Sequence, residues 1–184
     1  MTRANHQGVI GFISPVTFQP IEEVLQRVFE AGRDPFLLIL DRVTDVRNFG
    51  AICRTAECAG IDAVIIPSRG SARVGGDAMK TSAGALMNLP VCRSTNLKDT
   101  LDYLKNSGIR LVGCTEKTES PLYATKLEGP LGIIMGSEED GISPEYLKRC
   151  DERVKIPMFG KTGSLNVSVA TALVVYEVVR QRIG

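Results

Sequence analysis

Short, continuous apolar runs constrain the fold of this chain more strongly than any other feature of its sequence. Phe36–Leu40 and Leu131–Met135 carry no charged side chain, as expected for parallel strands that are buried on both faces of a sheet. Segments with helical spacing of apolar residues, such as Ile21 to Ala31, lie between such runs. The alternation predicts an α/β fold in which a mostly parallel sheet carries helices on both faces.

The same patterns divide the chain into a lead-in and one domain. Residues 1–20 show little periodicity and are expected to form an extended N-terminal lead-in, whereas residues 21–184 are expected to form a single domain with a substantial core. Strands are expected at residues 36–40, 63–66, 89–92, 110–114, 131–135 and 154–157. Helices are expected at residues 21–31, 51–59, 77–86, 97–105, 144–149 and 166–182.

Histidine and cysteine usage excludes several classes of enzyme. His6 is the only histidine, so neither a Ser-His-Asp hydrolase nor a histidine-ligated metal hydrolase is expected. The acidic run Glu138–Asp140 is by itself a weak magnesium site, and no metal is expected. The cysteines form no C-x-x-C pair, which argues against a zinc site and a disulfide framework and favours reduced cytosolic thiols.

Nucleotide-binding loops and targeting segments are also not indicated by the sequence. No G-x-G-x-x-G follows an expected strand, and Lys155 stands where a P-loop ending in Gly160–Thr162 would need its first glycine. The sequence contains neither an apolar run of membrane-spanning length nor an N-terminal signal pattern. A cytoplasmic protein without a membrane partner is therefore expected.

Polar side chains gather in three loops, each of which follows an expected strand. The loops are Asp41 to Arg54, Met135 to Ser143 and Ile156 to Ser168. The carboxyl ends of parallel strands share one edge, where open α/β sheets bind ligands. Asn48 and Asn166 also belong to a residue type that caps helices, which is their more ordinary interpretation. Together the loops predict a ligand site at this edge of the sheet.

Taken in order, the three loops resemble the motifs of one known family. The segments are N-F-G-A-I-C-R-T-A-E-C-A-G, I-M-G-S-E-E-D-G-I-S and I-P-M-F-G-K-T-G-S-L-N-V-S-V-A. They are similar to the motifs of the SpoU (TrmH) family of RNA 2'-O-ribose methyltransferases, in the SPOUT superfamily. The resemblance runs from about Phe36 to Arg182. Within the family, His6–Gly8 and the run L-I-L-D-R-V-T-D-V-R-N-F-G are most similar to the branch that methylates a guanosine ribose in bacterial large-subunit ribosomal RNA. Members of that branch usually carry a small RNA-binding domain before this point, and this chain begins where such a domain would end.

The resemblance carries expectations about fold, ligands and partners. It implies a deep trefoil knot in the C-terminal part of the α/β fold, although knots are rare among folds. It implies S-adenosylmethionine as the methyl donor, bound in the knot, and RNA as the substrate, with ribosomal RNA favoured over transfer RNA. It further implies a homodimer whose active site lies at the interface between the two copies.

The resemblance also assigns roles to individual residues. The positions matching donor contacts, made mainly through backbone groups, are Gly136, Ile156 and Leu165. The positions matching the family's active site are Asn48, Arg54, Glu138, Ser164 and Asn166. A guanidinium has a pKa above about 12, so we expect Arg54 to clamp a phosphate and stabilise a developing alkoxide rather than to act as a general base. Glu138 is expected to fix the loops or Arg54 through a charge-assisted hydrogen bond.

Basic residues and the last helix bear on the expected partners. Net charge is only +1, so binding of RNA requires a local basic patch. Residues in or near the loops that could form it are Arg42, Arg47, Arg69, Arg73, Lys80 and Lys161.

The helix expected at 166–182 is apolar around much of its circumference, which predicts burial against the knot and a second copy of the chain.

Two alternatives to a ribosomal RNA methyltransferase remain open from the sequence. One is a methyltransferase of the same fold that acts on transfer RNA. The other is a non-catalytic RNA-binding or ribosome-assembly protein, although such a relative would be expected to lose Arg54 or Asn166.

Overall fold

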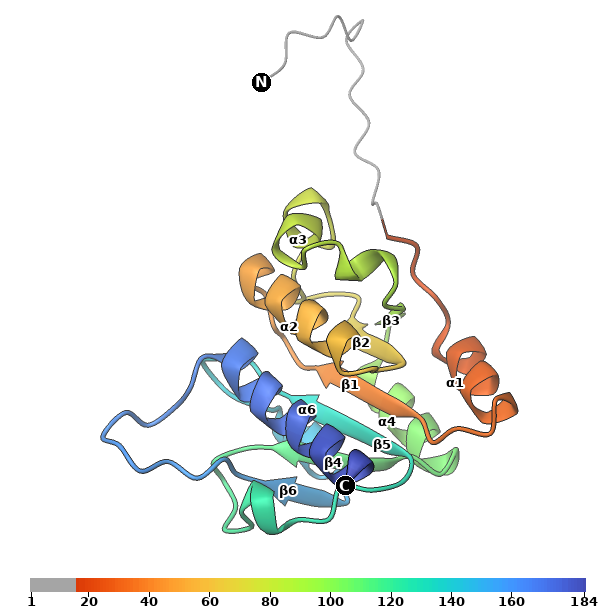
Figure 1. Cartoon of the computed structure of the whole chain (residues 1–184). Coiled ribbons are helices and arrows are strands. Elements are labelled where there is room, and N and C mark those ends of the chain that lie inside the picture. The colour runs from red at the N-terminus through yellow and green to blue at the C-terminus, as the bar shows by residue number, and fades with distance from the viewer. Residues whose placement is uncertain (1–15) are drawn as a thin grey trace, which may run out of the picture.

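Six strands form one parallel sheet, in the order β3-β2-β1-β5-β4-β6 (Figure 1). The structure is a computed structural model that describes residues 16–184. The strands are β1 (Phe36–Leu40), β2 (Ala63–Pro67), β3 (Val91–Ser94), β4 (Arg110–Cys114), β5 (Leu131–Met135) and β6 (Glu152–Val154). Each named pair of neighbouring strands is parallel. The expected parallel sheet is therefore confirmed.

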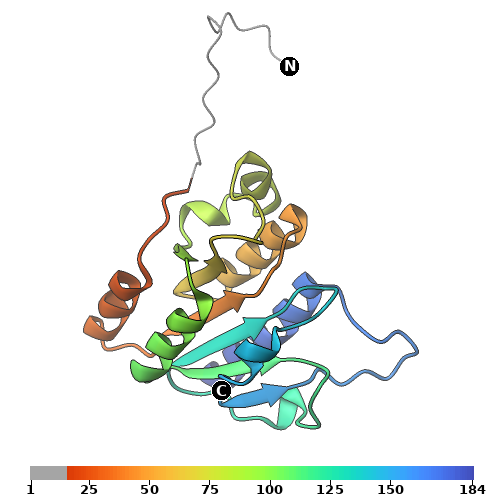
Figure 2. The same ribbon diagram turned by 180° about the vertical axis from the view of Figure 1, so that it is seen from behind.

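Helices cover both faces of this sheet, as the sequence predicts (Figures 1 and 2). One face carries α1 (Ile21–Glu30), α4 (Leu97–Asn106) and α5 (Pro144–Leu147), and the other carries α2 (Val46–Cys58), α3 (Gly76–Thr81) and α6 (Val167–Ile183). The side chains of β1 alternate between two cores, because successive residues of a strand point to opposite faces. Leu37 packs on the α1 side and Leu38 on the α2 side, and both are fully buried.

The central strands set the position of the site. β1 lies between β2 and β5, with Leu40 paired to Met135 at the carboxyl end. The connection after β1 leads away to β2 on one side, whereas the connection after β5 leads to β6 on the other. Adjacent strands whose connections diverge leave a crevice outside their carboxyl ends, where ligands bind in α/β folds.

Several element boundaries differ from the sequence-based expectation. Helix α2 begins at Val46 rather than at residue 51, because the Asp45 carboxylate accepts the backbone N–H of Asn48 and caps the helix. Asn48 thus lies inside the first turn and is not the N-cap. The helix expected at 77–86 is split into α3 and the 3-10 turn η1 (Ala85–Met87), because Ala83 and Gly84 adopt positive φ.

Strand β6 is also shorter and earlier than expected. It spans Glu152–Val154 rather than 154–157, since its partner β4 ends at Cys114, which pairs with Val154. The chain then pairs with a different segment, where Lys155 N donates to Ser120 O at 2.9 Å. Residue Ile156 therefore follows the strand instead of lying within it.

Other expectations concern the ends of the domain. Residues 1–15 of the expected lead-in lie outside the described residues, and Phe18 pairs with Val91 of β3. Helix α6 contacts α2, β5 and the 3-10 turn η2 (Leu122–Ala124). In the part of the chain that the structure describes, no helix is long and apolar enough to cross a lipid bilayer.

Candidate functional site

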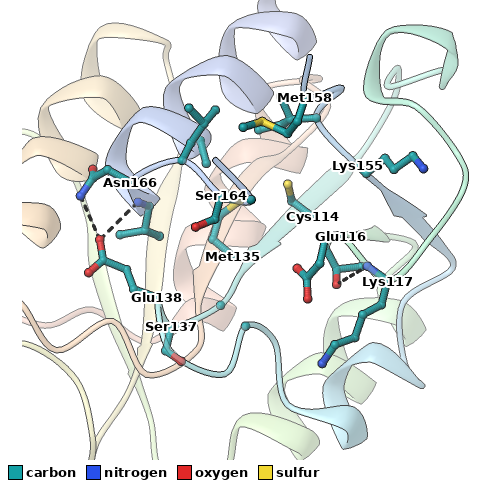
Figure 3. A pocket seen from close by; sticks show the side chains of 18 of the residues that line it. Cys114, Glu116, Lys117, Met135, Ser137, Glu138, Lys155, Met158, Ser164 and Asn166 are labelled. Carbon is teal, nitrogen blue, oxygen red and sulfur yellow. Dashed lines mark hydrogen bonds between the residues drawn. The ribbon is translucent and has the colours of Figure 1, made fainter. Parts of the chain in front are cut away.

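A cleft of about 1240 Å³ lies at the carboxyl edge of the sheet (Figure 3). Its walls come from residues 114–117 after β4, 135–141 after β5, and 155–158 and 163–167 on either side of the last loop. Pockets for small ligands usually occupy about 300–1,000 Å³, so the cleft has room for such a ligand and for part of a second substrate. The walls at 135–141, 156–158 and 163–167 fall within loops that the sequence singled out.

Gly136 forms part of the floor of this cleft and has no room for a side chain. It opens a tight turn in which Ser137 and Gly141 exchange two backbone hydrogen bonds, at 3.2 and 3.0 Å. A Cβ atom at position 136 would lie 2.1 Å from the carbonyl carbon of Gly141. The half-buried Ile156 and the exposed Leu165 line the same cleft. All three residues that were predicted to contact the donor therefore border one cavity.

Glu138 joins two asparagines from different loops into one hydrogen-bonded network. Its Oε1 accepts Asn48 Nδ2 and Asn166 Nδ2, both at 2.9 Å. Asn166 Nδ2 also donates to Asn48 Oδ1 at 3.1 Å. We call Asn48, Glu138 and Asn166 the amide–carboxylate network. It connects helix α2, the loop after β5 and the start of helix α6, so it assembles only when all three are packed together.

Asn166 has a second role, as the N-cap of α6. Its Oδ1 accepts Ser168 N at 3.0 Å and Ser168 Oγ at 2.6 Å. The Glu138 carboxylate also lies 3.4 Å from Val167 N, at the positive end of the helix dipole. The capping role predicted for Asn166 is confirmed, and the cap is part of the network.

Two of the predicted active-site residues lie apart from this network. Ser164 is exposed, lines the cleft and makes no hydrogen bond within residues 16–184. Arg54 is exposed on α2, six residues after Asn48, and lies outside the cleft. At about 3.6 residues per turn, six residues rotate a side chain by about 240° around the axis, so Arg54 and Asn48 face different directions. In the described part of the chain, Glu138 bonds to the asparagines and not to Arg54.

A smaller pocket of about 250 Å³ adjoins the cleft on the α2 side. Residues 42–45 and Asn48 form one wall, and residues 137–140 form the other. Glu138 lines both cavities. The amide–carboxylate network therefore stands between a large cleft and a small pocket, where it can contact ligands in both.

Sequence reasoning missed two parts of this site. Residues 115–117 line the cleft directly after β4, and their place after an apolar strand is the signal that identified the other loops. Asp41 is 1% exposed and accepts Ser143 N and Ser143 Oγ, both at 2.7 Å. A carboxylate directly after a fully apolar strand could have identified this residue, because such a group is buried only when it is hydrogen-bonded.

Cys114 is the thiol that lines the cleft (Figure 3). Burial raises the pKa of the Cys114 thiol to about 12, so it stays protonated at neutral pH. Because the thiolate is the reactive form of cysteine, this side chain contributes packing and not a nucleophile.

The residues expected to form a basic patch divide into two groups. Arg42 is ion-paired with Asp41 and Asp140. The others are exposed and form no ion pair within residues 16–184: Arg47, Arg69, Arg73, Lys80 and Lys161. Arg47 lies on α2 and Lys80 on α3, two helices that pack together. Two of these cations thus lie on packed helices, whereas Arg69 and Arg73 lie in the loop between β2 and α3 and Lys161 lies in the loop before α6.

Comparison with known proteins identifies similar chains. The profile of the SpoU rRNA Methylase family matches residues 35–176. The 23S rRNA (guanosine-2'-O-)-methyltransferase RlmB of Photobacterium profundum is 43% identical over 97% of this chain and 73% of its own. The same enzyme of Escherichia coli is 42% identical over the same shares.

A solved structure gives the same result for the fold. The SpoU methyltransferase AviRb from Streptomyces viridochromogenes, in complex with the cofactor AdoMet, superposes with a TM-score of 0.77 at 29% identity. The match covers 82% of this chain and 59% of that one. The present chain thus spans about three fifths of the length of the Streptomyces protein.

Proposed function

This chain belongs to the SpoU rRNA Methylase family, and from this premise we propose that it transfers a methyl group from S-adenosylmethionine to a ribose 2'-hydroxyl of RNA. The proposed target is a guanosine in large-subunit ribosomal RNA, as in the relatives from Photobacterium and Escherichia. The observation that carries the proposal is the amide–carboxylate network at the mouth of a cleft whose floor has no side chain at Gly136. Such a protein would act in the cytoplasm.

The cleft suits a donor that is recognised through backbone groups. Gly136 lines the cleft with backbone atoms, because the place of a Cβ there is taken by the backbone of Gly141 and Ile142, and Ile156 and Leu165 offer apolar contact beside it. The walls carry two lysines, Lys117 and Lys155, and more carboxylates, at Glu116, Glu138, Glu139 and Asp140. This net negative lining favours a cationic ligand. When bound, the donor supplies a methyl group on a positively charged sulfur.

The network can orient the acceptor hydroxyl. Asn166 Nδ2 donates both of its N–H groups, to Asn48 Oδ1 and to Glu138 Oε1. Asn48 Nδ2 donates only one of its two, to Glu138 Oε1. Glu138 Oε2 accepts no hydrogen bond within residues 16–184. The open N–H of Asn48 and the open Oε2 of Glu138 are thus one donor and one acceptor, which together can hold a hydroxyl in line with the methyl group. The proton leaves through a phosphate oxygen or water.

Arg54 is proposed to clamp an RNA phosphate beside the target ribose. It is exposed and forms no ion pair within the described residues, so its fork of donors is available for two phosphate oxygens. The free cations of α2, α3 and the 68–76 loop extend this surface and would track the RNA backbone.

Arg54→Lys tests the clamp, because lysine keeps the charge but cannot form two parallel hydrogen bonds. Loss of a charge-assisted hydrogen bond costs about 1.5–3 kcal/mol, and we expect kcat/KM for RNA to fall roughly 10- to 100-fold. The matched control is Arg33→Lys, which alters an ion pair with Asp62 near the opposite ends of the strands. Near-wild-type turnover by the Arg54 variant at neutral pH would count against a bidentate contact.

We further propose that the enzyme is a homodimer with its active site at the interface, and that its C-terminal part is knotted. Helix α6 leaves an apolar face exposed, with Val169 at 48%, Leu173 at 37% and Tyr176 at 48%. Exposed apolar patches of this kind mark protein interfaces. The connection between β4 and β5 is held against α6 by Gln181. Its Nε2 donates to Thr125 O, and its Oε1 accepts Leu127 N.

Leu173→Glu is therefore expected to produce a folded monomer, because a charge at the centre of an apolar interface is not compensated there. Static light scattering at micromolar concentration should give the dimer mass for the wild type and half that mass for the variant. Met87→Glu is the matched control, since Met87 is 76% exposed in η1, away from α6. A wild-type protein that is monomeric under these conditions would contradict the proposed dimer.

One experiment tests the proposed activity directly. Labelled S-adenosylmethionine is incubated with the protein and either ribosomal or transfer RNA, and the modified nucleotide is mapped. Methylation of a guanosine ribose in large-subunit RNA is expected. Label in transfer RNA alone would mean that the target is transfer RNA and not ribosomal RNA. If the protein neither binds the donor nor transfers its methyl group, it would instead be a non-catalytic RNA-binding protein.

A further inference from the structure

Arg42 adopts a backbone conformation that is unfavourable for its residue type. Its φ is +57°, in the left-handed region, and among residues 16–184 Ala83 is the other non-glycine residue with positive φ. A side chain in this region costs about 1–2 kcal/mol relative to glycine. Local strain of this kind persists only where surrounding contacts compensate for it, and it concentrates at functional sites.

The compensating contacts of Arg42 reach across to the loop after β5. Its Nη1 donates to Asp140 Oδ2 at 2.8 Å, and its Nη2 donates to the carbonyl of Gly141 at 3.2 Å. Its Nε donates to Asp41 Oδ1 at 3.0 Å. One guanidinium thus joins the end of the first loop to the tip of the second.

Asp41 holds the same loop at its two ends. Its backbone N–H donates to Met135 O at 2.8 Å, directly before the loop begins. Its buried carboxylate accepts Ser143 N and Ser143 Oγ, where the loop ends. Residues 136–143 are therefore fixed at both ends by Asp41 and at the tip by Arg42. We call these two residues the Asp41–Arg42 clamp.

The clamped loop is the one that carries Gly136 and Glu138. Glu138 lies two residues before Asp140, and both line the small pocket together with Arg42. We propose that Arg42, supported by Asp41, is a positioning residue for methyl transfer. It holds residues 136–143 in the shape in which Gly136 meets the donor and Glu138 meets Asn48 and Asn166. The inference rests on the proposed function.

A purely structural role for Arg42 predicts a different outcome. The exposed pair with Asp140 contributes only about 0–1 kcal/mol to stability, and glycine at position 42 would remove the backbone strain. The buried Asp41 carboxylate would, however, lose its charged partner. If Arg42 only stabilised the fold, Arg42→Gly would change the melting temperature and leave kcat and KM unchanged. If it positions the loop, the variant loses activity under conditions in which it remains folded.

The test compares Arg42→Gly with Ala83→Gly, since both variants relieve a positive φ and only the first removes a guanidinium. Melting temperature, the affinity for S-adenosylmethionine by calorimetry, and kcat and KM for both substrates are measured on the full chain. Misplacement of a reacting group by about 1 Å can cost roughly 10²-fold. We expect kcat/KM to fall at least about tenfold for Arg42→Gly and to stay within about twofold of wild type for Ala83→Gly.

A second variant keeps the proposal testable if Arg42→Gly folds poorly. Asp140→Asn removes the partner carboxylate, which is 66% exposed, and should lower kcat/KM in the same direction. If the two residues act through their contact, the double variant is no worse than Arg42→Gly alone. Wild-type kinetics in both single variants would overturn the inference, whereas a wild-type protein that methylates no RNA would remove the proposed function itself.

Discussion

Glu138→Ala should lower kcat by about 10²- to 10³-fold without unfolding the protein. One carboxylate oxygen accepts the side-chain amides of Asn48 and Asn166, and its removal leaves both without their shared acceptor. Loss of alignment by about 1 Å costs roughly 10²-fold, and the loss of the open Oε2 removes an acceptor for the hydroxyl as well. Single-turnover methylation of RNA at saturating donor measures this effect.

Glu138→Gln separates the two contributions of this side chain. Glutamine retains an oxygen for the asparagine amides but carries no charge, so we expect a smaller loss, of roughly tenfold, because charge-assisted hydrogen bonds are about twice as strong as neutral ones. Glu145→Gln is the matched control, since Glu145 pairs with Lys98 on the surface of α5. Turnover of Glu138→Ala within a few-fold of wild type would contradict the role that we propose for the network.

Gly136→Ala should weaken binding of S-adenosylmethionine by roughly 10- to 100-fold. The added Cβ would lie 2.1 Å from the carbonyl carbon of Gly141 and 2.2 Å from Ile142 N, and backbone atoms cannot move aside as a flexible side chain can. The turn must therefore change shape, and overpacking of this kind costs about 1–3 kcal/mol. Because the same turn lines the cleft, we expect the donor to bind less tightly. Calorimetric titration of the donor into the variant measures the loss.

Gly160→Ala is the matched control for this substitution. Gly160 lies in the last loop, and a Cβ there would meet nothing within 4 Å. Its donor affinity is expected to equal that of the wild type. Equal affinities of the Gly136 and Gly160 variants would show that the shape of the 136–141 turn is not needed for donor binding.

Much of the architecture could be predicted because burial leaves a direct mark on the sequence. The run Phe36–Leu40 is apolar throughout, and every one of its residues is buried. Loops after such strands meet at one edge, which is why the loops that carry Gly136, Glu138 and Asn166 could be assigned to one site before their distances were known. The individual residues came from the resemblance to the SpoU family. The rule rests on strand direction alone, so it needs no knowledge of side-chain contacts.

The sequence could not show which of two chemically similar side chains takes a given role. Asp45 and Asn48 are both capping residue types, three positions apart, and only the packed structure shows that Asp45 caps α2 while Asn48 turns to Glu138. The positive φ of Arg42 could not be predicted either, because glycine is the residue that usually indicates this conformation. The orientation of Arg54 away from the network followed once the true start of α2 was known.

The amide–carboxylate network has a consequence for the biosynthesis of the enzyme. Asn48 and Asn166 are 118 positions apart, and a ribosome adds about 5–20 residues each second. For several seconds the nascent chain therefore carries the first loop without the residue that completes the network. Parallel strand pairing is also slow, because loops must close before contacts form. We therefore expect methyl transfer to begin only after Asn166 has been synthesised and helix α6 has docked against α2.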